Sequence, residues 1–201
     1  MKENRELRMY GLVPYNISPI QQGIQFGHAV VEYGQMIKKS NKSTHVSRYN
    51  DWADNWKTFM ILNGGTSNHS VNRYHDSEEE FVGTMESNLL ALKEAGVLIG
   101  EFYEPDLNDM LSAIVFVVPE EVFNKKDYPD FEDWVIEHYG GLLKVDPNNN
   151  KSFGKSSYQL AKMIKESDDK HDQKIYKKWV DFIGGEQNVF LKDFLRNFRL
   201  A

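Results

Sequence analysis

Residues 17–29 have the sequence ISPIQQGIQFGHA, which predicts the start of an amphipathic helix. Ser18 can accept a hydrogen bond from a free amide of the first turn, and Pro19 at the first helical position gives up no hydrogen bond. Helical spacing places two stripes on this helix. The first is polar and consists of Gln21, Gln25, His28 and Glu32. The second is apolar and consists of Ile20, Ile24, Gly27 and Val31. We expect the apolar stripe to face the core and the polar stripe to face solvent or a ligand.

Two glycines, Gly23 and Gly27, lie four residues apart in the same helix. Each costs a helix about 1 kcal/mol relative to alanine. Their presence therefore suggests a surface that another backbone or a ligand approaches closely.

The composition is that of a globular protein with a sizeable core. The chain has 201 residues, of which 40% are hydrophobic, and no cysteine. No window approaches the roughly 18 consecutive apolar residues of a membrane-spanning helix, and the first residues lack the apolar run of a signal peptide. The absence of cysteine excludes disulfides and thiol chemistry. We expect a cytoplasmic protein that has no contact with a membrane.

The net charge of -6 is unevenly distributed along the chain. Residues 1–73 carry nine lysines and arginines against five acidic residues, an excess of +4, so the remainder carries -10. A basic first part beside the polar stripe fits a ligand that bears phosphate. A solvated basic face followed by an acidic tail is the alternative interpretation.

Short apolar runs predict four strands, one of them apolar throughout. The predicted strands cover residues 9–14, 57–63, 97–103 and 112–118. The last of these should be central in the sheet and covered on both sides. We expect the last two strands to pair across the loop 104–111.

Helices are predicted between these strands and after them. Ser77 and Glu80 form a capping box for a helix that Gly96 ends, with an apolar face of Phe81, Met85, Leu89 and Leu92. The order of elements predicts a three-layer α/β sandwich with a four-stranded mixed sheet over residues 1–119. Residues 120–201 predict a helical extension packed on it, with helices over 130–139, 156–166, 170–183 and 188–197.

The first part of the chain resembles a known family. The strand, the capped helix with Gln25, His28 and Ala29, and the apolar fourth strand are similar to the archaeal and eukaryotic (type 2) peptidyl-tRNA hydrolases. A closer resemblance is to uncharacterised hydrolase-like proteins of bacteria and phages, which share a Gln-x-Gly-His-Ala helix and a Glu-Pro-Asp-Leu sequence, here residues 104–107. The resemblance covers residues 7–119.

The resemblance implies an enzyme that cleaves the ester between a peptide and the terminal ribose of tRNA, without metal or cofactor. In the family, a lysine near the start of the helix, an aspartate after the third strand and a following threonine form much of the site. The lysine corresponds to Gln21 here, and the aspartate corresponds to Glu104. The loop with the threonine is shorter, which leaves Asn108 or Asp109 in its place.

These positions define a candidate site. Glu104 would act as general base, and His28 and Gln25 would orient the substrate or the attacking water. Four basic residues, Lys38, Lys39, Lys42 and Arg48, would contact phosphates. Each residue also has a structural interpretation: Gln21 could complete a capping box with Ser18, Gln25 and His28 could bond to a neighbouring strand, and Glu104 could be a loop charge.

Three functions remain open on these residues. The first is a hydrolase of peptidyl-tRNA or aminoacyl-tRNA, a carboxylic ester hydrolase of translation. The second is a catalytically inactive protein, in a phage setting, that binds a nucleotide or a small phosphorylated ligand. The third is an assembly role, with a second copy of the chain or another protein covering Trp134, Trp179, Phe190, Phe194 and Phe198. The remaining histidines lie in separate segments, so no metal site is expected.

Overall fold

The computed structural model describes residues 5–67, 83–139 and 170–201. The chain divides into two compact units. The first comprises Met1–Val118 and Phe198–Ala201, and the second comprises Pro119–Asn197. None of the helices in the described ranges has the length and apolar character needed to span a membrane.

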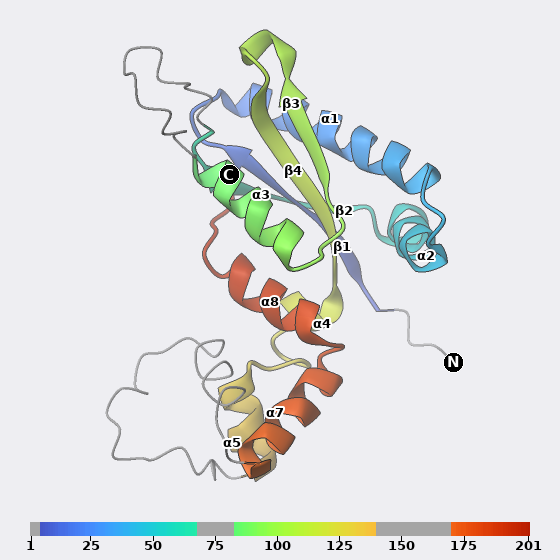
Figure 1. The fold of residues 1–201 in the computed structure, drawn as a ribbon, viewed down its shortest axis with the longest axis vertical. Helices are drawn as coiled ribbons and strands as arrows, with labels where there is room; N and C mark the ends of the chain where they lie inside the picture. The colour runs from blue at the N-terminus through green and yellow to red at the C-terminus, as the bar shows by residue number, and fades with distance from the viewer. Residues whose placement is uncertain (1–4, 68–82, 140–169) are drawn as a thin grey trace. The chain divides into compact units, whose positions relative to one another are not determined.

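A four-stranded mixed sheet forms the centre of the first unit (Figure 1). Its strands are β1 (Leu7–Pro14), β2 (Thr58–Gly65), β3 (Gly100–Glu104) and β4 (Met110–Pro119), in the order β2-β1-β4-β3. β1 and β2 are parallel, so their carboxyl ends lie at the same edge. β3 and β4 form an antiparallel hairpin, which confirms the predicted pairing of the last two strands.

Helices cover the two faces of this sheet. α1 (Pro19–Lys38), α2 (Ser43–Asp51) and the π-helix η1 (Trp52–Trp56) lie on one face, and α3 (Thr84–Glu94) lies on the other (Figure 1). The predicted apolar face of α3 is confirmed for Met85, Leu89 and Leu92, which are buried. The predicted start of this helix at a capping box of Ser77 and Glu80 is wrong, because α3 begins at Thr84 with Gly83 as its N-cap. Ser77, Glu80 and Phe81 themselves lie outside the described residues.

The core follows from the strand patterns. Every residue of β4 is buried, as expected for a central strand covered on both sides. Alternate residues of β1 and β4 contact buried residues of α1 on one face, and these include Met9, Val13, Ala113, Val115, Phe26, Ala29 and Tyr33. The predicted three-layer sandwich with a four-stranded mixed sheet is therefore confirmed.

The last residues of the chain pair with the outer edge of β2. Leu200 forms an antiparallel bridge with Leu62. The amide of Asn63 donates to the carbonyl of Arg199 at 2.9 Å, and the amide of Ala201 donates to the carbonyl of Ile61 at 3.0 Å. These bonds satisfy backbone groups that an edge strand leaves free.

The second unit is helical, as predicted for the extension. It contains α4 (Glu120–Phe123), α5 (Phe131–Tyr139), α7 (Lys170–Phe182) and α8 (Glu186–Leu195). The helix expected over 156–166 lies outside the described residues. Trp134 and Trp179 are buried in the core of this unit, beside Phe131 and Tyr176. The assembly role that needed both tryptophans for a partner therefore loses its basis.

A buried lysine joins three segments of the second unit. The side chain of Lys192 in α8 is only 4% exposed. Its amine donates to the carbonyls of Glu121, Val122 and Tyr128, at 3.1, 3.3 and 2.8 Å. These bonds satisfy carbonyls at the end of α4 and in the loop that leads to α5.

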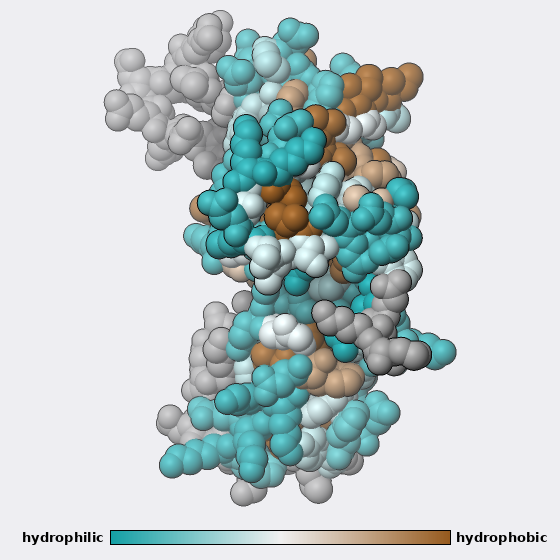
Figure 2. All heavy atoms as spheres, turned by 90° about the vertical axis from the view of Figure 1, so that its right-hand side faces the viewer, coloured by the Kyte–Doolittle hydropathy of each residue, from teal (hydrophilic) through white to brown (hydrophobic). Residues whose placement is uncertain are grey.

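The face that α1 turns to the core differs from the prediction. The buried residues of α1 are Gln25, Phe26, Ala29, Tyr33, Gly34 and Ile37. The predicted core stripe is on the surface instead, with Ile20 77% and Val31 61% exposed. Figure 2 shows hydrophobic residues (brown) exposed among hydrophilic ones (teal) on this face of the molecule. The reason is that α1 carries two apolar stripes, and the one with the aromatic residues offers more area to bury.

Gly23 and Gly27 of α1 mark no close approach of a backbone. A Cβ at Gly23 or Gly27 would meet no atom of the described residues within 4 Å. We therefore predict that Gly23→Ala and Gly27→Ala each stabilise the protein by about 1 kcal/mol, through helix propensity alone. Urea unfolding of the two variants measures this gain. A loss of stability at either position would show that the open surface is occupied in solution.

Candidate functional site

The structure brings Gln25 and Glu104 together from distant parts of the chain. Gln25 lies in the second turn of α1, and Glu104 ends β3. The Gln25 Nε2 atom donates a hydrogen bond to Glu104 Oε2 at 2.5 Å. Gly100 allows α1 to lie this close to β3, since a Cβ there would be 2.9 Å from the carbonyl oxygen of Ala29. The amide of Asp106 approaches the other oxygen, Glu104 Oε1, at 3.3 Å.

A serine that the sequence analysis did not single out completes this cluster. Ser112 Oγ donates to Gln25 Oε1 at 2.8 Å and also lies 3.2 Å from the carbonyl oxygen of Phe102. Ser112 is fully buried, and Gln25 is only 5% exposed. The β3–β4 register shifts beside Ser112, because Phe102 pairs with Ala113 whereas Tyr103 pairs with Leu111. This bulge turns Ser112 toward α1, although strict alternation would place it on the opposite face.

His28 lies one helical turn after Gln25 and is exposed. Its ring packs edge-on against Phe102, with the ring centroids 4.6 Å apart. Phe102 and Glu104 are two residues apart in β3, so they point to the same face of the sheet, about 7 Å apart along the strand. His28, through its contact with Phe102, and Glu104 therefore lie on the same side of β3, where α1 packs against it.

Asn108 and Asp109 lie in the turn that joins β3 to β4. Both are exposed, and both have positive φ angles, 56° and 55°. Asn and Asp tolerate this left-handed conformation better than most residues, which gives them a structural reason to be here. Their predicted contact with substrate stays a prediction.

Gln21 has the structural role that the sequence left open. Its side-chain oxygen accepts from the amide of Ser18 at 3.0 Å, while its own amide donates to Ser18 Oγ at 3.3 Å. This is a complete capping box at the start of α1. Gln21 is thus a neutral side chain that stabilises the start of α1.

The predicted phosphate-binding residues lie far from Glu104. Gln25 and Lys38 are thirteen residues apart on α1, which corresponds to about 20 Å along the helix axis. Lys39, Lys42 and Arg48 follow Lys38 at this far end of α1 and in α2. Burial, followed by the nearby charges of Lys42 and Arg48, lowers the pKa of His45. The structure thus separates the basic residues from the carboxylate.

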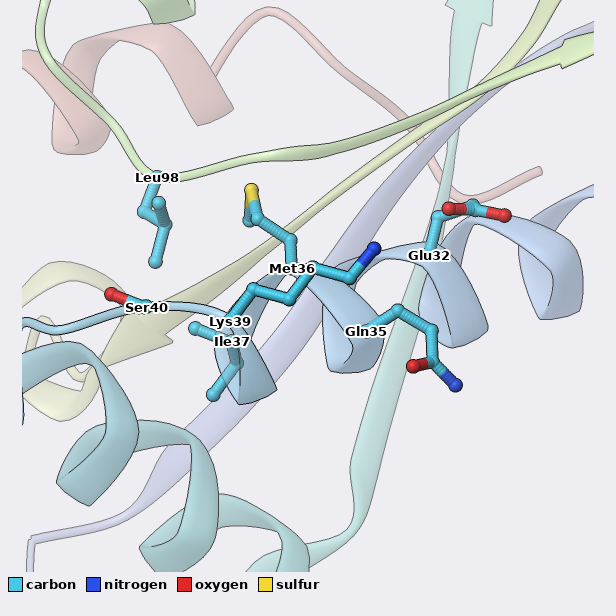
Figure 3. A pocket seen from close by; sticks show the side chains of 7 residues that line it. All are labelled: Glu32, Gln35, Met36, Ile37, Lys39, Ser40 and Leu98. Carbon is cyan, nitrogen blue, oxygen red and sulfur yellow. The ribbon is translucent and has the colours of Figure 1, made fainter.

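A shallow pocket of about 490 Å³ lies at the same far end of α1. Figure 3 shows Leu98, from the segment before β3, facing the last turns of α1. The other lining residues combine apolar, polar and charged side chains, namely Glu32, Gln35, Met36, Ile37, Lys39 and Ser40. Sequence reasoning found Lys39 but missed the pocket, because Leu98 approaches α1 only in the fold.

Comparison of the chain with protein-family models, curated proteins and solved structures finds no match. Two features of the first unit therefore bear on its function. One is the hydrogen-bonded cluster of Glu104, Gln25 and Ser112. The other is the basic end of α1 with its pocket.

Proposed function

We propose that this protein is a peptidyl-tRNA hydrolase-like enzyme that cleaves the ester of peptidyl-tRNA or aminoacyl-tRNA at Glu104. The observation that carries the proposal is the hydrogen bond from Gln25 to Glu104. It fixes a carboxylate at the end of a strand, on the side of the sheet where His28 is exposed. The motifs that resemble the hydrolase family, residues 25–29 and 104–107, also support the proposal. Both lie within the first unit.

The chemistry requires a base that takes one proton and later returns it. Glu104 would accept a proton from water while the water oxygen bonds to the ester carbonyl carbon. When the ester C–O bond breaks, the ribose oxygen would take that proton from Glu104. Gln25 and the Asp106 amide each occupy one acceptor site of the carboxylate, and each oxygen keeps another for water. His28, which is exposed, offers a ring N–H on the same side of β3.

The direct test is the release of free tRNA from peptidyl-tRNA and from aminoacyl-tRNA by the purified chain. Release above the spontaneous rate supports the proposal and shows which ester is preferred. No release, from protein with the circular dichroism of a folded α/β chain, would refute it. Because Gln21 is neutral and bonded to Ser18, the charge on a developing oxyanion would have to be stabilised by other groups.

A second candidate function is the binding of a nucleotide or another small phosphorylated ligand without catalysis. The observation that favours it is the pocket at the basic end of α1. Lys39 lines this pocket, and Lys42 and Arg48 lie near it in the sequence. A volume of about 490 Å³ lies within the range of small-molecule sites. This site is separate from Glu104, so the two candidates predict different residues.

Charge reversal at the basic end distinguishes the two ligands. We predict that Lys39→Glu with Lys42→Glu weakens binding of a nucleoside monophosphate at least about tenfold if the ligand is small, with a shallow dependence on salt. If the ligand is tRNA, affinity should fall steeply with salt in the unchanged protein, since many phosphates are contacted. Lys170→Glu, an exposed lysine of the second unit, is the control. Equal binding by all three proteins would exclude this end of α1.

A further inference from the structure

The two ends of the Gln25 side chain face two different groups. Nε2 points to Glu104 and Oε1 points to Ser112. A carboxylate only accepts hydrogen bonds, so this orientation of the amide belongs to the ionised form of Glu104. The hydroxyl of Ser112 supports the same orientation by donating to Oε1.

The protonated form of Glu104 calls for the reverse orientation. A carboxylic acid donates one hydrogen bond, and the amide Nε2 cannot accept it. If the Gln25 amide turns by 180°, Oε1 accepts the proton of Glu104 and Nε2 faces Ser112 Oγ. Ser112 can then act as acceptor, because its own hydroxyl hydrogen has a second partner, the carbonyl oxygen of Phe102 at 3.2 Å. Every polar atom of the buried cluster is satisfied in both arrangements.

Other titratable groups lie around this cluster and could disturb it. His28 and Glu32 share the side of α1 that carries Gln25, and Asp106 and Asp109 lie in the turn after Glu104. Among these, only Asp106 has a described bond to Glu104, and that bond is made by its backbone amide. The carboxyl of Glu104 is thus the ionisable group in direct contact with the Gln25 amide.

We propose that Gln25 and Ser112 are positioning residues that follow the proton of Glu104, through a reversal of the Gln25 amide. Such a pair would stabilise Glu104 both before and after it takes a proton from water, which is what a general base requires during turnover. The catalytic meaning rests on the proposed function, but the reversal itself requires no substrate.

The experiment is a pH titration of the full chain by NMR, with the glutamine side-chain amides assigned by through-bond correlations. The range is about pH 3 to 6, where glutamate carboxyls ordinarily titrate. At the upper end, the Gln25 amide protons should show nuclear Overhauser contacts to the Glu104 γ-methylene. At the lower end, those contacts should be lost and contacts to the Ser112 β-methylene should appear. The midpoint pH of this change should equal the midpoint pH of the change in the Glu104 carboxyl-carbon chemical shift.

Two controls make this result specific. Gln22 donates from its own Nε2 to the carbonyl of Pro14 at 3.0 Å, so its contacts should stay constant. In Glu104→Gln, which has no proton to gain in this range, the contacts of Gln25 should no longer change. If the Gln25 amide stays beside Glu104 throughout, or still reverses in Glu104→Gln, the proposal is wrong.

Kinetics test the link to turnover separately. Ser112→Ala should lower kcat with little change in KM, and Ser112→Thr, which keeps the hydroxyl, should restore it. A reversal seen by NMR without any hydrolase activity would refute the proposed function and leave the amide reversal standing. Hydrolase activity without a reversal of the Gln25 amide would support the proposed function and refute the amide reversal.

Discussion

Glu104→Gln is expected to reduce the rate of tRNA release by at least about 100-fold, because a positioned general base contributes about 10²–10⁴-fold. The amide that replaces the carboxylate has the same shape, and its oxygen can still accept from Gln25 Nε2. It cannot take a proton from water near neutral pH. Single-turnover release of tRNA from a labelled peptidyl-tRNA measures the effect.

Asp106→Asn is the matched control for this variant. Asp106 is an exposed acid two residues further along the same turn. It contacts Glu104 through its backbone amide, which the substitution leaves in place. Its rate should stay within about twofold of the unchanged protein if Glu104 is the base. Similar losses in both variants would point to the charge of the turn, and an unaffected Glu104→Gln would remove Glu104 from the mechanism.

The sheet was predictable because its strands have simple patterns. β4 is buried along its whole length, and its run of apolar residues from Ala113 to Val118 is typical of a strand covered on both faces. The start of α1 was equally clear, since Ser18, Pro19 and Gln21 form a local signal that depends on no other part of the chain. Local chemistry and burial on both sides can be read from a single sequence.

The face of α1 was not predictable by the same reasoning. Its two apolar stripes have the same period, and periodicity alone does not say which one a sheet will cover. The covered stripe also contains Gln25, a polar residue that is buried because two partners satisfy both ends of its amide. Those partners come from β3 and β4, more than seventy residues away. The spacing along α1 places Gln25 on the polar stripe, but it does not reveal that Gln25 is buried.

The role of Ser112 depends on a β-bulge. Alternation along β4 assigns Ser112 to the face opposite α1, together with Ile114 and Phe116. The register shift opposite Phe102 turns it to the other side. A lone serine at the start of an otherwise apolar strand was the signal that could have drawn attention to it. The sequence contains nothing that fixes the place of the bulge.

Lys192→Met should destabilise the second unit by about 3 kcal/mol. The substitution keeps much of the apolar stem but removes the donor of three hydrogen bonds, and it leaves the carbonyls of Glu121, Val122 and Tyr128 without that partner. A buried acceptor left unpaired costs about 1–3 kcal/mol. Hydrogen exchange of the α8 amides in the full chain measures the change.

Lys125→Met is the control that separates the loss of the three Lys192 hydrogen bonds from the loss of a positive charge near Asp130. Lys125 Nζ lies 3.3 Å from Asp130 Oδ2, whereas Lys192 Nζ lies 3.9 Å from Asp130 Oδ1. The side chain of Lys125 is 60% exposed, so its removal should cost less than about 1 kcal/mol. Equal losses in the two variants would assign the effect to Asp130 and not to the three carbonyls.

The pKa of Lys192 predicts how the stability of the unchanged protein and of Lys192→Met should differ with pH. Burial lowers the pKa of Lys192 to about 8, against the opposing effect of Asp130. The folded state therefore releases this proton at a lower pH than the unfolded state, whose lysine has the ordinary value of 10.5. The free energy of unfolding should therefore increase as the pH rises from about 8 to 10.5, by up to about 1 kcal/mol per pH unit. This gain should be absent below about pH 8. The difference between the unchanged protein and Lys192→Met should grow over this range. A constant difference would mean that the buried amine keeps its proton, held by the three carbonyls that it joins.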